Sequence, residues 1–410
     1  MILIVVIFAG LFSVLFVLVS LLFVQTLCAV PSMRKAPASF SDSSVDRPSV
    51  AILIPAHNEE QGVAATVQHI KSQLREHDRI VVVADNCSDA TAEVARSVGA
   101  EVAERSDLQR RGKGFALDFG VQYLATHRAA ESTGDSIARP PEIVIIVDAD
   151  CHVYAGSIDI LALAVQRSGR PAQSLDLMVA PRGSGPMKKI AEFAWMVKNF
   201  VRPLGYARLG LPCHLMGTGM AFSWSMISAA NLANGHVVED LKLGMDFARI
   251  GQPALFCPDA KVVSYFPVSS SGATTQRARW EHGHIKMIVD TAPGLLLTAL
   301  RERNSALFAL TLDMCVPPVA LLALLIVALF LVTGGVAIIM GSVWAFDCAS
   351  LLIFEFTVTI FICWIRYGRQ IISFQELLIA PWYMLRKIPL YLAYFIRRQV
   401  EWIRTQRDHE

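Results

Sequence analysis

Three long apolar runs divide the chain into membrane-type and soluble-type sequence. Residues 2–24 and 314–340 contain no charged residue, and residues 349–365 contain only Glu355. Apolar runs of roughly 20 residues are long enough to cross a bilayer as helices. We therefore expect an N-terminal transmembrane anchor over residues 1–27 and two further transmembrane helices at about 314–340 and 349–365. A secretory signal is the alternative for the first run, but that run has no basic start and no convincing small-residue cleavage site.

The stretch 49–285 has a different pattern, in which short apolar strands alternate with amphipathic helices. Strands are predicted in VAILIPA, in Ile80–Val83 and in Ile143–Val147, and helices follow the first two. Alternating strands and helices predict an α/β domain with a mostly parallel sheet. The polar residues that follow the strands should then meet at one edge of the sheet, which is where ligands bind in such domains.

The remaining segments connect or anchor this domain. Residues 28–48 are rich in Ser, Pro and Ala and are predicted to be a linker. Residues 286–410 form a C-terminal membrane region, whose last part, at about 377–404, mixes aromatic, leucine and arginine residues. This composition favours a helix that lies in the membrane interface. A fourth crossing is the alternative, but its basic residues leave only a short apolar gap.

Composition and charge narrow the class of protein. Of the residues, 54% are apolar, the formal net charge is +2, and the eight cysteines are scattered singly. The chain has no basic patch interleaved with aromatics, so we expect no nucleic acid as a partner. Basic residues flank one side of all three apolar runs, which indicates a multi-pass protein of the bacterial inner membrane with a cytoplasmic central domain. These flanking residues are Arg34, Lys35, Arg301, Arg303, Arg366 and Arg369.

Asp148 and Asp150 are the first candidate site residues, because they directly follow a buried strand. Carboxylate oxygens at this place can hold Mg²⁺ or Mn²⁺, and such a cation stabilises a diphosphate leaving group. A DAD sequence alone is better explained by a turn that caps a helix. The interpretation of this pair as a metal site therefore depends on the other fragments.

Asp240 in VVED is the candidate general base, because a carboxylate within reach of an acceptor hydroxyl can take its proton. One base without a second nucleophile predicts a single displacement and inversion at the anomeric carbon. The alternative is that Glu239 and Asp240 are acidic residues favoured by the helix dipole.

Three further fragments are candidates for substrate contacts. Arg279 in QRARW can pair with phosphate oxygens, and Trp280 offers a flat apolar wall to a sugar or lipid headgroup. Lys113 lies in a basic, glycine-containing turn suited to a nucleotide phosphate. The turn Gly217–Gly219 could let an acceptor approach the backbone, and a structural turn is an equal alternative.

In order, the fragments PAHNEE, ADNCSDAT, GKGFALDFG, VDAD, GTGMAF, VVED and QRARW resemble the motif series of membrane-bound family-two inverting glycosyltransferases, such as cellulose synthase, hyaluronan synthase and ceramide glucosyltransferase. The resemblance covers residues 49 to 284. It implies a GT-A fold, a UDP-sugar donor, a divalent metal and a transferase activity. Departures are Ala84 before Asp85, Val238 in place of a threonine, and Cys151 after DAD.

The resemblance also implies a role for each matching residue. Donor-binding positions are Pro55, Ala56, Asn58, Glu59, Asp85, Lys113, Asp148 and Arg279. Acceptor-binding positions are Gly217, Thr218, Gly219, Glu239, Gln276 and Trp280. The metal ligands are Asp150 and Asp148, of which Asp150 is preferred, and the catalytic base is Asp240.

The expected activity is transfer of one sugar from a UDP-sugar to a membrane-embedded acceptor, either a lipid-linked saccharide or a glycolipid precursor. A processive polysaccharide synthase is one alternative, although three predicted crossings are few for a secretion channel. A non-catalytic membrane scaffold that binds nucleotide sugars is the other.

Overall fold

A computed structural model describes residues 2–30, 47–127, 140–236, 238–267, 270–341 and 343–396. Most of the predicted linker, the end of the predicted interfacial helix and the side chain of Gln276 lie outside the described residues. The chain divides into two compact units. One, the sheet unit, comprises the described residues of Lys35–Val179 and Pro212–Pro267. The other, the apolar-helix unit, comprises Met1–Arg34, Ala180–Leu211 and Val268–Gln399.

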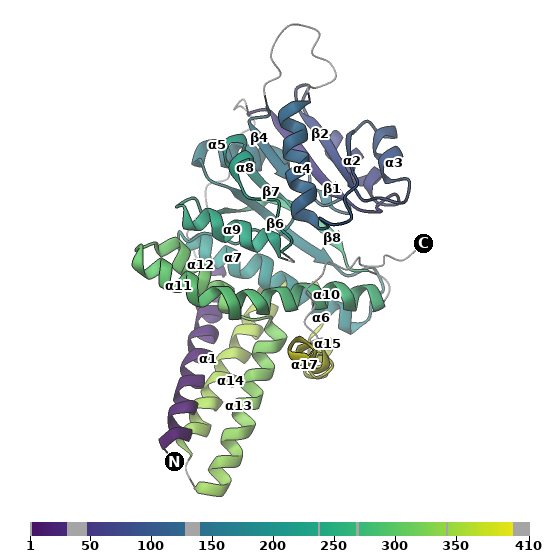
Figure 1. Ribbon diagram of the computed structural model, residues 1–410. Coiled ribbons are helices and arrows are strands. Elements are labelled where there is room, and N and C mark those ends of the chain that lie inside the picture. Colours follow the sequence, from purple (N-terminus) through teal and green to yellow (C-terminus); the bar gives the residue numbers. More distant parts are fainter. Residues whose placement is uncertain are drawn as a thin grey trace. The chain divides into compact units, whose positions relative to one another are not determined.

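The sheet unit contains an eight-stranded sheet in the order β3-β2-β1-β4-β7-β6-β8-β5 (Figure 1). Neighbours β3, β2, β1 and β4 are parallel, and so are β6 and β8, whereas β7 and β5 run antiparallel to their partners. The strands are β1 (Val50–Ala56), β2 (Arg79–Asp85), β3 (Glu101–Arg105), β4 (Ile143–Ile146), β5 (His152–Val153), β6 (Ala172–Val179), β7 (Met220–Ser223) and β8 (Leu255–Tyr265). The mostly parallel α/β sheet predicted from the alternating pattern is confirmed.

Helices cover this sheet because its central strands are apolar on both faces. Ile52, Leu53 and Ile145 are fully buried, as expected for parallel strands between helical layers. Helix α4 packs on β1 and β2, and α5 packs on the half of the sheet that contains β6 to β8. The helices of this unit are α2 (Val63–Lys71), α3 (Thr91–Ser97), α4 (Lys113–Thr126), α5 (Ser157–Ser168), α8 (Trp224–Ala229) and α9 (Glu239–Arg249).

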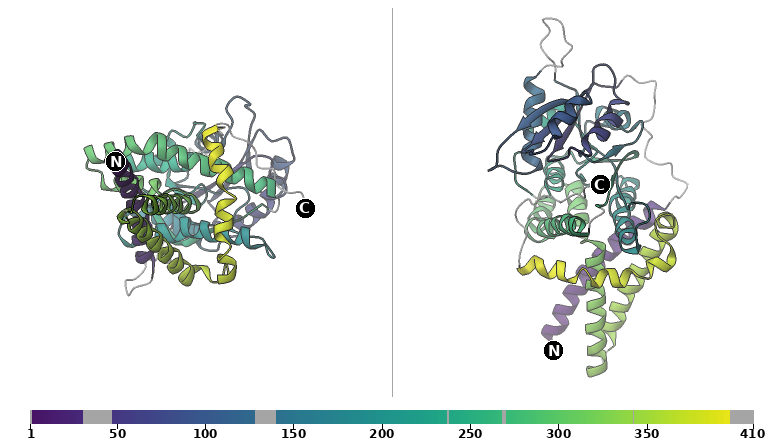
Figure 2. Two further views of the ribbon diagram at one scale, coloured as in Figure 1. Left: turned by 90° about the horizontal axis from the view of Figure 1, so that it is seen from below. Right: turned by 90° about the vertical axis from the view of Figure 1, so that its right-hand side faces the viewer.

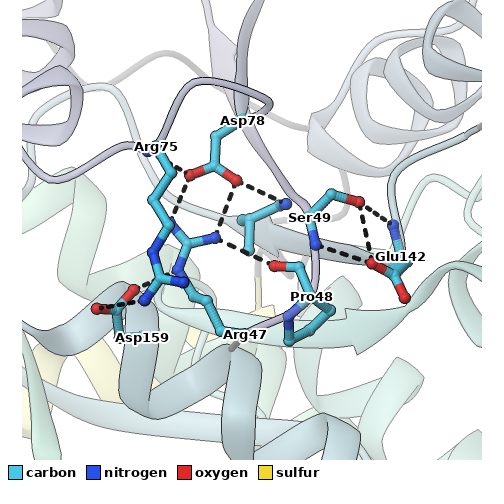
Figure 3. A network of polar contacts seen from close by, with 8 residues as sticks. Arg47, Pro48, Ser49, Arg75, Asp78, Glu142 and Asp159 are labelled. Atoms are coloured by element: carbon cyan, nitrogen blue, oxygen red, sulfur yellow. Dashed lines mark hydrogen bonds and ion pairs between the residues drawn. The ribbon is translucent and has the colours of Figure 1, made fainter. Parts of the chain in front are cut away.

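A buried ion-pair network fixes the chain where it enters the sheet (Figure 3). The guanidinium group of Arg47 pairs with Asp78 and Asp159, and its Nη1 lies 2.9 Å from Asp78 Oδ1. Asp78 also accepts hydrogen bonds from the backbone amides of Val50 and Arg75, at 2.9 and 2.7 Å. Burial alone would raise the pKa of Asp78, but these hydrogen bonds lower it below its usual value.

Among its described residues, the apolar-helix unit contains three helices long and apolar enough to cross a membrane: Val6–Ala29, Val319–Ile339 and Trp344–Gly368. Within this unit, α14 packs against both α1 and α13 (Figure 1). The helices are α1 (Ile2–Ala29), α6 (Pro186–Met196), η1 (Val197–Val201), α7 (Arg202–Arg208), α10 (Ser270–Lys286), η2 (Met287–Thr291), α11 (Ala292–Arg301), α12 (Ser305–Cys315), α13 (Val319–Met340), α14 (Trp344–Cys363), η3 (Trp364–Gly368), α15 (Phe374–Leu377), α16 (Ala380–Leu385) and α17 (Ile388–Ile396).

Two departures from the expected organisation occur in this unit. Residues 180–211 cluster with the apolar helices, although the sequence places them inside a continuous domain. The described part of the predicted interfacial helix consists of three short helices, α15 to α17, rather than one. Pro381 at the start of α16 and Pro389 at the start of α17 explain the breaks, since proline is tolerated in the first turn of a helix and disrupts its interior.

Polar contacts hold α7 and α12 to the first apolar helix. Arg202 Nη2 donates to Asp313 Oδ1 at 2.7 Å, and Gln25 Nε2 donates to the same oxygen at 2.5 Å. All three residues are buried. A side chain at Gly205 would meet the backbone oxygen of Gln25 at 2.1 Å, so α7 approaches α1 at a position where only glycine fits.

Candidate active site

The turn that carries Asp148 and Asp150 follows the end of β4, and two threonine side chains hydrogen-bond to its backbone. The backbone amide of Asp148 donates to the hydroxyl of Thr218 at 3.1 Å, and the carbonyl of Ala149 accepts from Thr66 at 2.8 Å. Both threonines are buried. The turn is therefore fixed through its backbone, which leaves the two carboxylates for other contacts.

Asp148, Asp150 and Cys151 form a group that could hold a metal ion, because one ligand atom from each lies within 4.8 Å of the others. The cysteine is the least suitable member for Mg²⁺ or Mn²⁺, which prefer oxygen. Burial, and then the charges of Asp150 and Asp148, raises the pKa of Cys151 well above its usual value. Its protonated thiol donates to Asp150 Oδ1 at 3.8 Å.

Lys113, the first residue of α4, brings a positive charge to this turn. Its ammonium group pairs with Asp148 and donates to the carbonyl of Gly217 at 2.8 Å. Burial by itself would lower the pKa of Lys113, but the carboxylates of Asp148 and Glu239 raise it above its usual value. Lys113 is therefore a permanent cation among several carboxylates.

Asp240, in the first turn of α9, lies beside the same lysine. A Cβ atom at Gly217 would stand 3.4 Å from Asp240 Oδ2 and 3.8 Å from Lys113 Nζ. Gly217 also has φ of +94°, a conformation that favours glycine. The structure thus brings together four segments that are far apart in the sequence: the start of α4, the turn after β4, the turn before β7 and the start of α9.

Glu239 is a carboxylate of this group whose pKa is shifted by its burial and its neighbours. Burial, and then the charge of Asp240, raises the pKa of Glu239 to about 7, against the opposing effect of Lys113. Behind Glu239 and Asp240 lies a cavity of about 10 Å³, room for about one water molecule. Its lining is mainly apolar: Gly114, Leu117, Met220, Asn231, Leu232, Asn234, Glu239, Asp240 and Leu243.

The turns after β1 and β2 interlock beside this site. His57 Nδ1 lies 2.6 Å from the carbonyl of Asp85, and the side chain of Asn58 accepts from the amide of Ser88 at 2.7 Å. The amide of Glu59 donates to Thr91 Oγ1 at 2.7 Å. Pro55 and Ala56 are the last residues of β1. The predicted donor-binding positions in β1, β2 and the turns after them therefore belong to one local structure. They are Pro55, Ala56, Asn58, Glu59 and Asp85.

Arg105, at the end of β3, contacts the predicted donor-binding residue Asp85, and the sequence did not reveal this contact. Its Nη1 lies 2.6 Å from Asp85 Oδ1, and the two residues are register partners in the parallel pair of β2 and β3. Burial raises the pKa of Asp85 despite the hydrogen bond and charge of Arg105. The sequence signal that could have predicted this contact is the basic residue Arg105 at the end of the strand that follows Asp85.

The turn Gly217–Gly219 is held by contacts on its inner side. The side chain of Thr218 is buried, and its hydroxyl accepts a hydrogen bond from the amide of Asp148. A Cβ at Gly219 would lie 1.8 Å from the hydroxyl of Ser174 on β6, whereas Gly217 lies beside Asp240. The approach of an acceptor to the backbone of this turn stays a prediction.

The QRARW motif lies in α10, within the apolar-helix unit. The ring of Trp280 packs against Trp195 of α6, with ring centroids 5.1 Å apart. His282 and His284, next in the same helix, bond to the carbonyls of Leu390 and Met314, at 2.8 Å each. The contribution of Arg279 and Trp280 to diphosphate and acceptor binding stays a prediction.

Comparisons with known proteins agree with this arrangement. A family model described as glycosyltransferase like family 2 matches residues 48–283. Two 4,4'-diaponeurosporenoate glycosyltransferases of Staphylococcus aureus, from strains RF122 / ET3-1 and USA300, are 38% and 36% identical over 85 residues. Each match covers 20% of this chain and 22% of the relative, so this chain spans about a fifth of the length of these curated relatives.

A solved structure shares the fold over nearly the whole chain. The mannosyltransferase of Pyrobaculum calidifontis, solved with GDP-Man and Mn²⁺, is similar with a TM-score of 0.53 and 16% identity. The match covers 93% of this chain and 99% of that one. The predicted GT-A fold is confirmed by this likeness. Because the family match spans residues 48–283, more than half of the 410 residues, the chain belongs to the glycosyltransferase like family 2.

Proposed function

We propose that the protein transfers one sugar from a UDP-sugar to a lipid-linked saccharide or lipid acceptor in a bacterial inner membrane, with inversion at the anomeric carbon. The observation that carries this proposal is the convergence of Asp148, Glu239 and Asp240 around Lys113. Such a group of acids next to a single cation suits a site that binds a divalent cation and a diphosphate.

Asp240 acts as the general base in this proposal. The acceptor hydroxyl oxygen attacks the anomeric carbon, its proton passes to Asp240, and the bond from the anomeric carbon to the diphosphate oxygen breaks to release UDP. One displacement exchanges one bond for another, so the configuration inverts. Lys113 lies beside Asp148 and Asp240 and offsets the repulsion between them when both are ionised.

Asp148 and Asp150 would hold Mg²⁺ or Mn²⁺, which supplies positive charge to the departing diphosphate. Their spacing fits a divalent cation because ligand atoms of both lie within one 4.8 Å group. The Mn²⁺ found with the similar mannosyltransferase supports a divalent metal. That protein was solved with GDP-Man, which makes a GDP-sugar the second donor to test.

Three features support a lipid acceptor. The described part of the chain has three helices long and apolar enough to cross a membrane. Its curated relatives are named for an acceptor of carotenoid type, 4,4'-diaponeurosporenoate. The basic residues that flank the apolar helices favour a cytoplasmic catalytic domain, on the side where nucleotide sugars are made.

The experiment is a donor panel with the purified protein in bacterial lipid extract and Mn²⁺, measured by UDP or GDP release and by labelled lipid. The proposal expects a labelled lipid of discrete size with a UDP-sugar. A ladder of long polymer would favour the processive synthase instead. Nucleotide-sugar binding without release from any donor would favour the non-catalytic scaffold.

A further inference from the structure

Helices α15 to α17, residues 374–394, have one exposed apolar face, and we call them the surface segment. Large apolar side chains recur at helical spacing along it and are exposed to solvent: Phe374, Leu378, Trp382, Leu385, Ile388 and Leu392. The tyrosines between them, Tyr383, Tyr391 and Tyr394, are buried. The segment is therefore apolar on its outer side and packed on its inner side.

The bilayer surface is the partner that fits this outer face. The surface segment follows five residues after η3, the end of the apolar helix Trp344–Gly368. Within the apolar-helix unit it runs across the direction of α13 and α14 rather than along it (Figure 2). Helices that lie across membrane-spanning helices, with exposed Trp and Leu on one face and Arg or Lys nearby, suit the interface between lipid and water.

The inner face of the same segment contacts α10, the helix of the QRARW motif. The ammonium group of Lys387 pairs with Glu281, and the two side chains are only 12% and 11% exposed. One turn further, the carbonyl of Leu390 lies 2.8 Å from His282 Nε2, and the rings of His282 and Tyr394 are 5.6 Å apart. Glu281 and His282 directly follow Arg279 and Trp280 in the chain.

Tyr391 completes this contact. It is buried, and burial together with the charge of Glu281 raises its pKa, so that its hydroxyl stays protonated next to the carboxylate. The geometry of the whole contact is specific, because a desolvated ion pair loses most of its attraction if either partner shifts. Breaking such a pair on one side leaves an uncompensated buried charge.

We infer that the surface segment couples the bilayer to catalysis: its outer face lies in the lipid surface, and Lys387 with Glu281 fixes the position of the helix that carries Arg279 and Trp280. Lys387 and Glu281 are positioning residues here and do not contact the substrate. The inference rests on the proposed function only where it concerns transfer; the positioning itself is a property of the fold.

Hydrogen exchange of residues 277–286 tests the positioning without any assay of activity. The full chain in phosphatidylethanolamine and phosphatidylglycerol vesicles is compared with Lys387→Met, Glu281→Gln and the double variant Trp382→Ser/Leu385→Ser. Exchange in all three variants should be about tenfold faster, because local opening of α10 becomes easier. The double variant is decisive because Trp382 and Leu385 are exposed and take no part in the ion pair. Exchange in α10 should respond to this variant only if the outer face of the surface segment is coupled to α10. Unchanged exchange in Lys387→Met or in the double variant would overturn the inference.

Arg96→Met is the matched control, because it breaks an exposed ion pair with Glu104 in the sheet unit and should leave exchange in α10 unchanged. A second readout separates this inference from the proposed function. In Lys387→Met, transfer to the lipid acceptor should fall by about tenfold to a hundredfold, and donor hydrolysis without acceptor should fall with it, because the same helix carries the predicted donor contact Arg279. Wild-type transfer in Lys387→Met would contradict the coupling, whereas a wild-type protein inactive in both assays would contradict the proposed function and leave the exchange result to decide the positioning.

Discussion

The hydroxyl of Thr218 accepts a 3.1 Å hydrogen bond from the backbone amide of Asp148, beneath the turn that carries the candidate metal ligands. Thr218→Val keeps the shape and removes this acceptor, which leaves a buried amide without its partner at a cost of about 1–3 kcal/mol. We expect the turn to lose its fixed position and the apparent affinity for Mn²⁺ to fall by about tenfold.

The measurement is a Mn²⁺ titration of UDP release at saturating donor. Thr218→Ser retains the hydroxyl and serves as the control, with an affinity close to that of the wild type. An unchanged Mn²⁺ affinity in Thr218→Val would show that this hydrogen bond does not order the metal site.

Lys113→Met removes the cation that lies between Asp148, Glu239 and Asp240. The carboxylates then repel one another without compensation, so we expect turnover to fall by about a hundredfold, as for loss of a preorganised charged donor. The assay is UDP release at saturating donor and metal. Lys242→Met is the control, because Lys242 pairs with Asp246 on the exposed side of α9. Turnover above a third of the wild-type rate in Lys113→Met would contradict the role given to this lysine.

Arg105→Met tests the residue that holds Asp85. Asp85 would remain buried without its cation, and its pKa, already raised by burial, would rise further. We expect UDP to bind about tenfold more weakly, because one charge-assisted contact that orients the carboxylate is lost. Isothermal titration of UDP gives the dissociation constant. Equal UDP affinity in Arg105→Met and wild type would show that Arg105 does not contribute to donor binding.

Asp78 predicts a pH dependence of stability. Its pKa is lower in the folded protein than in the unfolded chain, so it stabilises the fold above its unfolded pKa, and this contribution is lost as pH falls through the folded value. At neutral pH, Asp78→Asn breaks the buried pair with Arg47 and should destabilise the protein by about 3 kcal/mol.

Thermal unfolding in detergent between about pH 7 and pH 3 follows this effect. The difference in melting temperature between the wild type and Asp78→Asn should shrink as the pH falls below about 4, near the unfolded pKa of an aspartate. A difference that stays constant over this range would mean that Asp78 does not titrate as the structure indicates.

The sequence predicted three of the eight strands of the sheet, β1, β2 and β4, because these three are apolar runs. It predicted Asp85, Lys113, Asp148 and Asp240 as members of one site, since all four belong to the motif series of the resemblance, and the structure brings the last three within reach of one another. Their roles in binding and catalysis stay predictions until they are measured.

Other features depend on contacts that no local pattern reveals. Arg105 meets Asp85 only through the register of two strands. Thr218 looks like a polar turn residue until the structure shows it buried under Asp148. Residues 180–211 contain no long apolar run, so nothing local indicated that they pack with the apolar helices.

The central claim is that Asp240 removes the acceptor proton in a site organised by Asp148 and Lys113. Turnover and UDP binding of Asp240→Asn, measured on the same preparation in lipid extract with Mn²⁺, test it most directly. The account predicts that turnover falls by about a thousandfold while the UDP dissociation constant stays within about threefold of the wild-type value, since the asparagine keeps the size and polarity of the side chain. Wild-type turnover in Asp240→Asn would contradict it.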